Sequence, residues 1–252
     1  MTLDSQAIKL KGLAVGIGGT FVAECDDVEL ERGKVLVLVG KNGSGKSTFL
    51  RTIAGILKPL SGEIWFGETQ QKSIKMEKTI AWLSQEEHLE FLWTVREYVS
   101  LGRIAQNQGL TLNAKDEQAI SQALEESDCQ SLSNRFVLEL SGGERQRVRF
   151  ARALAQETPI ILMDEPTTHL DIEHQIQVLE LIEKLARQGK TIIVSLHDVT
   201  QAKNIGSQFL LFTDAKITKC ESLNKELLEQ TLGVKFEQFG DGLTLPTYFC
   251  QN

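Results

Sequence analysis

The sequence predicts an α/β fold: a mostly parallel sheet flanked by helices, with an N-terminal antiparallel β patch and an inserted α-helical subdomain. Apolar runs that begin at Val35, Ile160 and Thr191 alternate with segments of helical spacing. Strands buried on both faces of a parallel sheet read as such unbroken runs. Helical spacing dominates residues 86–156, which predicts the inserted subdomain.

Composition narrows the class of protein. The 252 residues suit one large domain, or a core with a small insertion, and 41% hydrophobic residues suffice for a packed core. A net charge of −7 with interspersed signs argues against a general nucleic-acid binder. The 4 cysteines show no metal-ligand spacing, which predicts reduced thiols in a cytosolic protein. No apolar run approaches the ~20 residues that span a bilayer.

The N-terminal half begins with alternating residues. Ile8 and Leu10, and then Leu13, Val15 and Ile17, alternate as strands do. Gly18-Gly19 marks a turn, so residues 1–34 are predicted to form the antiparallel patch. This interpretation is favoured over a signal peptide, because glycines interrupt the apolar stretch and acidic residues follow it. The next elements are predicted as a buried strand at 35–39, a helix at 49–57, and strands at 63–66 and 79–83.

The insertion and the second half follow. Asp116 is expected to cap one helix, and Ser141 a longer helix that runs through Ala155. A buried strand from residue 159, a helix at 172–188 and a strand at 191–196 then complete the sheet. The predicted domains are a nucleotide-binding core, residues 1–86 and 157–252, and a helical subdomain, residues 87–156.

A glycine-rich stretch lies between the strand at 35–39 and the following helix, and it fits the phosphate-loop pattern G-x-x-x-x-G-K-[ST]. Glycines let the backbone wrap an anion, and the amides and the helix N-terminus supply partial positive charge. Lys46 is expected to reach the β- and γ-phosphates, and the Ser47 hydroxyl to bind Mg²⁺. The predicted nucleotide-binding residues of this loop are Gly40, Lys41, Asn42, Gly43, Ser44, Gly45, Lys46, Ser47 and Thr48.

Further candidates follow the other apolar strands. Asp164 ends one strand, Glu165 is next to it, and His197 follows another. Because ligands of open α/β sheets bind beyond the carboxyl ends of the strands, Gly40, Asp164 and His197 are expected at one edge. Asp164 suits a Mg²⁺ partner, and Glu165 is placed to accept a proton from an attacking water.

A family resemblance follows from motifs in a fixed order. These are Lys46, Gln85, the stretch Leu140-Ser141-Gly142-Gly143-Glu144, Asp164-Glu165 and His197. From about residue 8 to residue 202 the chain resembles the nucleotide-binding subunit of an ABC transporter. The Leu-Ser-Gly-Gly-Glu stretch separates this family from other phosphate-loop NTPases. The resemblance implies an ATPase that uses ATP and Mg²⁺, with a phosphate-loop NTPase core.

The resemblance also implies roles for individual residues. Glu165, His197, Gln85 and Lys46 would form the catalytic set, with His197 at the γ-phosphate. Ser47, Gln85 and Asp164 would hold the metal. The other nucleotide contacts are expected from a second amide-rich helix N-terminus, made of Ser141, Gly142, Gly143 and Glu144.

One nucleotide in the first loop is not expected to touch both anion sites of one chain. The family solves this with a head-to-tail dimer, in which the Ser141–Glu144 turn of one subunit closes on the ATP of the other. A homodimer is therefore expected, and residues 168–171 resemble the segment that lines its seam. Where the family usually stacks an aromatic residue on adenine, this chain has Ile17, with Phe21 as the neighbouring alternative. Weak selection for the base is predicted.

The resemblance implies partners as well. Integral membrane permease subunits would dock near residues 85–99, with Phe91, Leu92 and Trp93 as candidate anchors, although a buried core role fits these residues equally well. The chain would lie peripherally on the cytoplasmic face of the inner membrane, indirectly serve a substrate-binding protein, and bind no nucleic acid. Residues 94–103 and 167–171 resemble importer ATPases for iron-siderophore, haem or cobalamin complexes. The alternatives are another cargo, or a non-transport ABC ATPase of the iron–sulfur assembly, translation or repair type.

Overall fold

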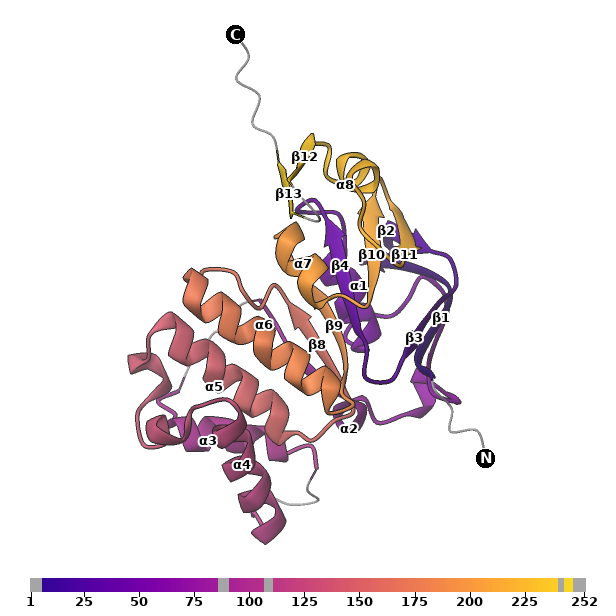
Figure 1. The fold of residues 1–252 in the computed structure, drawn as a ribbon. Helices are drawn as coiled ribbons and strands as arrows, with labels where there is room; N and C mark the ends of the chain where they lie inside the picture. The colour runs from indigo at the N-terminus through magenta and orange to yellow at the C-terminus, as the bar shows by residue number, and fades with distance from the viewer. Residues whose placement is uncertain (1–5, 86–90, 107–110, 240–242, 247–252) are drawn as a thin grey trace.

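The computed structural model describes residues 6–85, 91–106, 111–239 and 243–246, in a mixed sheet with flanking helices and a separate helical group (Figure 1). The strands are β1 (Gln6–Ile17), β2 (Thr20–Cys25), β3 (Val28–Glu31), β4 (Val35–Gly40), β5 (Ser61–Phe66), β6 (Thr69–Gln70), β7 (Ile80–Leu83), β8 (Ile160–Asp164), β9 (Thr191–Ser195), β10 (Gln208–Thr213), β11 (Lys216–Cys220), β12 (Phe236–Phe239) and β13 (Leu243–Pro246). The α-helices are α1 (Lys46–Ile53), α2 (Met76–Thr79), α3 (Val95–Ser100), α4 (Ala114–Glu126), α5 (Gly142–Ala155), α6 (Ile172–Arg187), α7 (Val199–Ile205) and α8 (Lys225–Leu232). The 3₁₀ helices are η1 (Gln71–Ser73), η2 (Leu101–Arg103), η3 (Gln130–Leu132) and η4 (Val137–Glu139).

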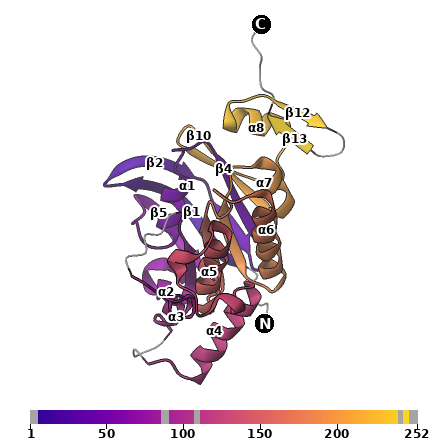
Figure 2. The ribbon, with the colours of Figure 1, turned by 90° about the vertical axis from the view of Figure 1, so that its left-hand side faces the viewer.

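One large sheet holds the fold together. Its strand order is β6-β5-β1-β2-β11-β10-β4-β9-β8-β7, with β3 paired to β1. The strands from β10 to β7 in this order are parallel. Antiparallel pairing of β1 with β2, β3 and β5 forms the N-terminal patch. The predicted fold class is therefore confirmed. A small hairpin, β12–β13, lies near α8 in Figure 2 and was not predicted from the sequence.

Both faces of the parallel strands are covered, which explains the unbroken apolar runs. In β4, Leu36 and Leu38 face a cluster that includes Phe49 and Leu50 of α1. Val35, Val37 and Val39 face the opposite cluster, to which α5, α6 and α7 contribute. Successive strand residues point to opposite faces, so one apolar segment serves two cores.

The helices between β7 and β8 have an apolar cluster of their own. It includes Val95, Tyr98, Ile120, Leu124 and Val148, which come from α3, α4 and α5. In Figure 1 these helices lie beside the sheet, away from the antiparallel patch. This cluster supports the predicted division into residues 1–86 plus 157–252 and residues 87–156, which stays a prediction.

Two predicted helix boundaries were wrong. The first helix occupies Lys46–Ile53 rather than residues 49–57. It ends early because Gly55 has a φ of +74°, and because Gln71 Nε2 donates to the carbonyls of Thr52 and Ile53. Asp116 does not occupy the N-cap position of α4. Asn113 does, and Asp116 is the third helical residue, whose carboxylate accepts from the Asn113 amide at 2.9 Å.

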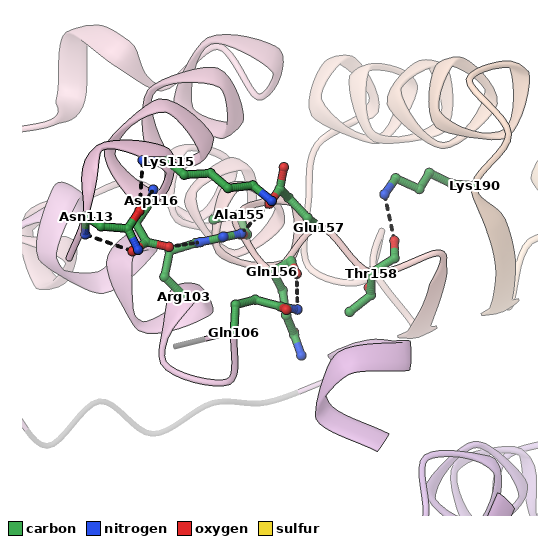
Figure 3. Close-up of polar contacts among 10 residues, drawn as sticks. All are labelled: Arg103, Gln106, Asn113, Lys115, Asp116, Ala155, Gln156, Glu157, Thr158 and Lys190. Atoms are coloured by element: carbon green, nitrogen blue, oxygen red, sulfur yellow. Dashed lines mark hydrogen bonds and ion pairs between the residues drawn. The ribbon is translucent and has the colours of Figure 1, made fainter. Parts of the chain in front are cut away.

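Buried Arg103 pairs with Asp116 inside the helical group and reaches the loop before β8 through the partly exposed Glu157 (Figure 3). Arg103 is 2% exposed, and its Nε lies 2.9 Å from Oδ1 of Asp116, which is also buried. Arg103 Nη1 donates to the Ala155 carbonyl at 2.6 Å and to Glu157 at 2.7 Å. The guanidinium therefore ties the start of α4 and the end of α5 to the segment that re-enters the sheet.

The described cysteines, Cys25, Cys129 and Cys220, are free thiols. Burial raises the pKa of Cys25 and of Cys129 to about 12, so neither forms a reactive thiolate near neutral pH. Cys250 lies outside the described residues. In the ranges that the structure describes, no helix has the length and apolar character needed to cross a bilayer.

Candidate active site

The site lies where neighbouring parallel strands end. β4 ends at Gly40, β8 at Asp164 and β9 at Ser195, and these strands are adjacent in the order β4-β9-β8. β7 ends at Leu83 on the far side of β8, and Gln85 follows it shortly. Because the strands run in parallel, the residues after them meet at one edge, as the sequence predicts.

The phosphate loop wraps around its own lysine. Gly43 and Gly45 have φ values of +77° and +103°, which a residue with a Cβ rarely adopts. A Cβ on Gly40 would lie 2.7 Å from Cβ of Phe212 and 2.8 Å from Oγ of Ser44. The turn therefore requires glycine at positions 43 and 45, and the close approach of β10 requires glycine at position 40.

Lys46 is the buried cation of this loop. Its side chain is 4% exposed, and Nζ donates to the carbonyls of Gly40 at 2.7 Å and Lys41 at 2.9 Å. Burial lowers the pKa of Lys46, while the nearby carboxylates of Glu165 and Asp164 act in the opposite direction. An ammonium has three N–H donors. Two of those of Lys46 bond to the loop carbonyls, so the third can donate to a bound anion.

A pocket of about 430 Å³ opens above the loop. It is lined by Ile17, Val22, Asn42, Gly43, Gly45, Lys46, Ser47, Thr48, Gln85 and Glu165. The pocket wall therefore gathers half of the predicted nucleotide-binding residues and three of the four predicted catalytic residues, Lys46, Gln85 and Glu165. Gly40, Lys41 and Ser44 belong to the same loop but do not line the pocket wall.

The residues present fit a phosphate group with its metal. Ser44 Oγ is buried and has no hydrogen-bond partner within the described ranges, so an anion or a water would satisfy it. Ser47, Gln85 and Asp164 offer hydroxyl, amide and carboxylate oxygens, which are the hard ligands that Mg²⁺ prefers. These assignments stay predictions.

Glu165 lies at the centre of a polar network. Its Oε2 accepts from Gln85 Nε2 at 2.7 Å, and its Oε1 lies 2.5 Å from His197 Nε2. Its φ of +51° is unusual for a residue with a side chain, and it turns the chain sharply after β8. The predicted base, the predicted metal-contacting amide and the predicted γ-phosphate contact are thus in direct contact.

Sequence reasoning missed Ser195. Its hydroxyl donates to Oδ1 of Asp164 at 2.8 Å and accepts from the Glu165 amide at 2.9 Å. Ser195 is completely buried, so this link fixes the two acidic residues relative to β9. A hydroxyl residue at the end of an otherwise apolar strand was the signal that could have revealed it.

The Ser141–Glu144 turn lies outside this pocket. Ser141 Oγ accepts from the Glu144 amide at 3.3 Å, and the Glu144 carboxylate accepts from the Ser141 amide at 2.8 Å, so the pair caps α5. A Cβ on Gly143 would overlap the ring of His174, whereas Gly142 has open space around it. Within one chain, then, this turn and Lys46 are not brought together.

Ile17, not Phe21, lines the pocket wall, and Val22 joins it. Ile17 and Phe21 lie near the hairpin between β1 and β2, where Gly16 pairs with Phe21 and Ile17 with Thr20. Val22 was missed by sequence reasoning, because alternation along a strand does not reveal which face borders a pocket formed by distant loops. An apolar surface on this wall suits a flat base.

Strand, glycine loop, buried lysine and acidic strand end together define a nucleotide-binding protein of the phosphate-loop class. The sequence profile of the ABC transporter family matches residues 25–168. An achromobactin transport ATP-binding protein of Dickeya dadantii (strain 3937) is 43% identical over 201 residues, 78% of this chain and 75% of that protein. A ferric enterobactin transport ATP-binding protein of Escherichia coli (strain K12) is 37% identical over 244 residues, 93% and 90% of the two chains. An iron(3+)-hydroxamate import ATP-binding protein of Bacillus subtilis (strain 168) is 33% identical over 247 residues, 94% and 92%.

Solved structures agree with the sequence comparisons. A chain described as belonging to a metal-chelate type ABC transporter in an inward-facing conformation superimposes with a TM-score of 0.84 at 28% identity, covering 96% of this chain and 98% of that one. A dimeric bacterial ABC transporter cassette gives a TM-score of 0.72 at 29% identity, covering 86% and 99%. The chain belongs to the ABC transporter family. It is an ATP-binding subunit whose activity is ATP hydrolysis coupled to transport.

Proposed function

We propose that this subunit powers the import of an iron-siderophore complex, or of a related haem or cobalamin complex, through partner membrane subunits. The names of its relatives support this class of cargo, since they are transport proteins for achromobactin, ferric enterobactin and iron(3+)-hydroxamate. The single observation that carries the mechanism is the contact of Glu165 with both Gln85 and His197, on the wall of the Lys46 pocket.

The roles of the residues follow from their chemistry. Lys46 and the loop amides bind the phosphates, and Glu165 accepts a proton from the attacking water. His197, which lies against Glu165, would contact the γ-phosphate. Ser47, Gln85 and Asp164 would hold Mg²⁺, and the bound metal would supply positive charge to the phosphate oxygens. Positioning and charge neutralisation are what phosphoryl transfer needs most.

The working unit in this proposal is a head-to-tail homodimer. The Ser141–Glu144 turn is a helix N-terminus that lies away from the Lys46 pocket of its own chain, so a second copy would supply it. Dimeric cassettes at 28–29% identity to this chain support that arrangement. The γ-phosphate then bridges the two copies, and its loss after hydrolysis loosens them.

Membrane permease subunits are proposed to dock beside Gln85. Phe91 is 65% exposed and Leu92 is 71% exposed, while Trp93 packs against the helical cluster. The rings of Phe91 and Trp93 meet edge-to-face, with centroids 5.9 Å apart. Exposed apolar residues held by a packed neighbour support a docking surface. Residues 86–90 of the predicted surface lie outside the described residues. Docking would hold the chain on the cytoplasmic face of the inner membrane, where it serves a substrate-binding protein indirectly.

The proposal is tested by isolating membranes from cells that express a tagged full chain and identifying what co-purifies in mild detergent. A many-span membrane protein should be retained, and uptake of a labelled iron-siderophore complex should require the chain. Phe91→Ser with Leu92→Ser should release the membrane protein, whereas Ile104→Ser, another exposed apolar residue, should not. Recovery with a soluble scaffold, ribosomes or DNA instead would favour a non-transport ABC ATPase.

A further inference from the structure

A hydrogen-bonded link runs from α5 to both segments that carry Gln85 and Glu165. Arg149, half-buried on α5, donates through Nη2 to the carbonyl of Ser84, the residue before Gln85. Through Nη1 it donates to Oε1 of Gln146 at 2.9 Å. The Gln146 amide in turn donates to the carbonyl of Pro166, the residue after Glu165, at 2.9 Å.

These contacts form a closed ring. Gln85 Nε2 donates to Oε2 of Glu165 at 2.7 Å on one side of it, and Arg149 with Gln146 completes the other side. Gln146 is 7% exposed, so its bond to Pro166 is shielded from competing water. The backbones next to Gln85 and Glu165 are therefore both held by side chains of one helix, α5.

The helix that carries this link is itself fixed. Phe150 and Ala153 of α5 pack in the same apolar cluster as Leu83 of β7 and Met163 of β8. Gln146 and Arg149 are three residues apart, so they share one face of α5. The first turn of the same helix carries the Ser141–Glu144 cap. A shift of that cap would reach Ser84 and Pro166 through a rigid element.

We propose that Arg149, acting through Gln146, is a positioning residue for ATP hydrolysis: it sets the separation of Gln85 and Glu165 and couples it to α5. This inference rests on the proposed roles of Gln85 and Glu165. Arg149 and its bonding partners Ser84 and Gln146 lie outside the lining of the Lys46 pocket, so Arg149 affects the chemical step rather than nucleotide affinity. Misplacing catalytic groups by about 1 Å can cost up to ~100-fold in rate.

The experiment measures ATP hydrolysis by the purified full chain. Arg149→Met keeps the apolar stem and removes the donors. It should lower kcat by about 10- to 100-fold and leave KM for ATP within about twofold. Gln146→Met should have a similar effect, and Arg149→Lys should restore part of kcat because its ammonium can still donate to one carbonyl. The matched control is Arg147→Met: Arg147 is a half-buried arginine on α5 that donates to Gln177 instead, and kcat should stay near that of the parent.

A double variant separates positioning from general destabilisation. In a Gln85→Ala background, Arg149→Met should lower kcat by much less than in the parent, because the ring is already open. The inference would be overturned if Arg149→Met and Arg147→Met had equal kcat. It would also be overturned if the fold-loss of kcat in the double variant equalled the product of the fold-losses in the Arg149→Met and Gln85→Ala variants. Glu165→Gln is assayed in parallel. If it abolishes hydrolysis while Arg149→Met does not lower kcat, only this inference fails. If it hydrolyses ATP normally, the proposed base assignment fails.

Discussion

His197 Nε2 lies 2.5 Å from Oε1 of Glu165, although the two residues belong to different strand–loop connections. β8 and β9 are adjacent and parallel, so the residues that follow them are delivered to the same point of the sheet edge. The Ser195 hydroxyl reinforces this placement by bonding both to Asp164 and to the Glu165 amide. The carboxylate of Glu165 is therefore held at the pocket wall by several elements at once.

Glu165→Gln tests the role of the carboxylate. The amide keeps the shape of the side chain but cannot accept a proton, so kcat should fall by about 10²- to 10⁴-fold while ATP still binds. Unhydrolysed ATP should then hold two subunits together, so size-exclusion chromatography in the presence of ATP should show a dimer. Normal hydrolysis by this variant would contradict the assignment.

Lys46→Ala tests the role of the buried ammonium. A charge-assisted hydrogen bond contributes roughly 1.5–3 kcal/mol, so ATP affinity should fall by about 10- to 100-fold in isothermal titration. Lys58→Ala, which removes an exposed lysine beyond the end of α1, serves as the control. Equal losses of ATP affinity in the two variants would show that net charge, and not the Lys46 contact, determines ATP binding.

Ile17 tests base recognition. Because Ile17 and Val22 present an apolar wall without an aromatic ring, ATP and GTP should be turned over at comparable rates. Ile17→Ala should raise KM for both nucleotides, and Phe21→Ala should change little, since Phe21 does not line the pocket. Strict preference for ATP would count against this interpretation.

The paired glycines of the α5 cap make a matched test of stability. A Cβ on Gly143 would overlap His174, so Gly143→Ala should lower the free energy of unfolding by about 1–3 kcal/mol. Gly142 has no neighbour within 4 Å of such a Cβ, so Gly142→Ala should be neutral or stabilising by up to ~1 kcal/mol. Urea denaturation of both variants measures the difference, and the reverse order would contradict the observed packing.

Arg103 tests the link between the helical group and the sheet. Arg103→Met removes the charge partner of the buried Asp116 carboxylate and the donor to Glu157, which should lower the free energy of unfolding by about 3–5 kcal/mol. Arg187→Met removes an exposed pair with Glu183 and should change stability little. Chemical denaturation compares the two. A small loss for Arg103→Met would show that Asp116 is satisfied by other contacts.

The sequence alone determined the fold class, the family and the phosphate loop, because a local pattern specifies each of them. These patterns are the unbroken apolar runs, the short signature stretch and the glycine spacing. It also indicated that Gly40, Asp164 and His197 would meet at one edge of the sheet, since parallel strands deliver their ends together. The predicted roles of these residues rest on that placement and on the family resemblance.

Only the tertiary structure decided which side chains touch. Asn113 rather than Asp116 caps α4, Ile17 rather than Phe21 lines the pocket, and Arg149 reaches Ser84 across a long stretch of sequence. Periodicity specifies which face of an element is buried, but not which distant residue packs against it. Those pairings depend on the order of strands in the sheet and on the position of α5 above it, and neither is encoded in any single segment.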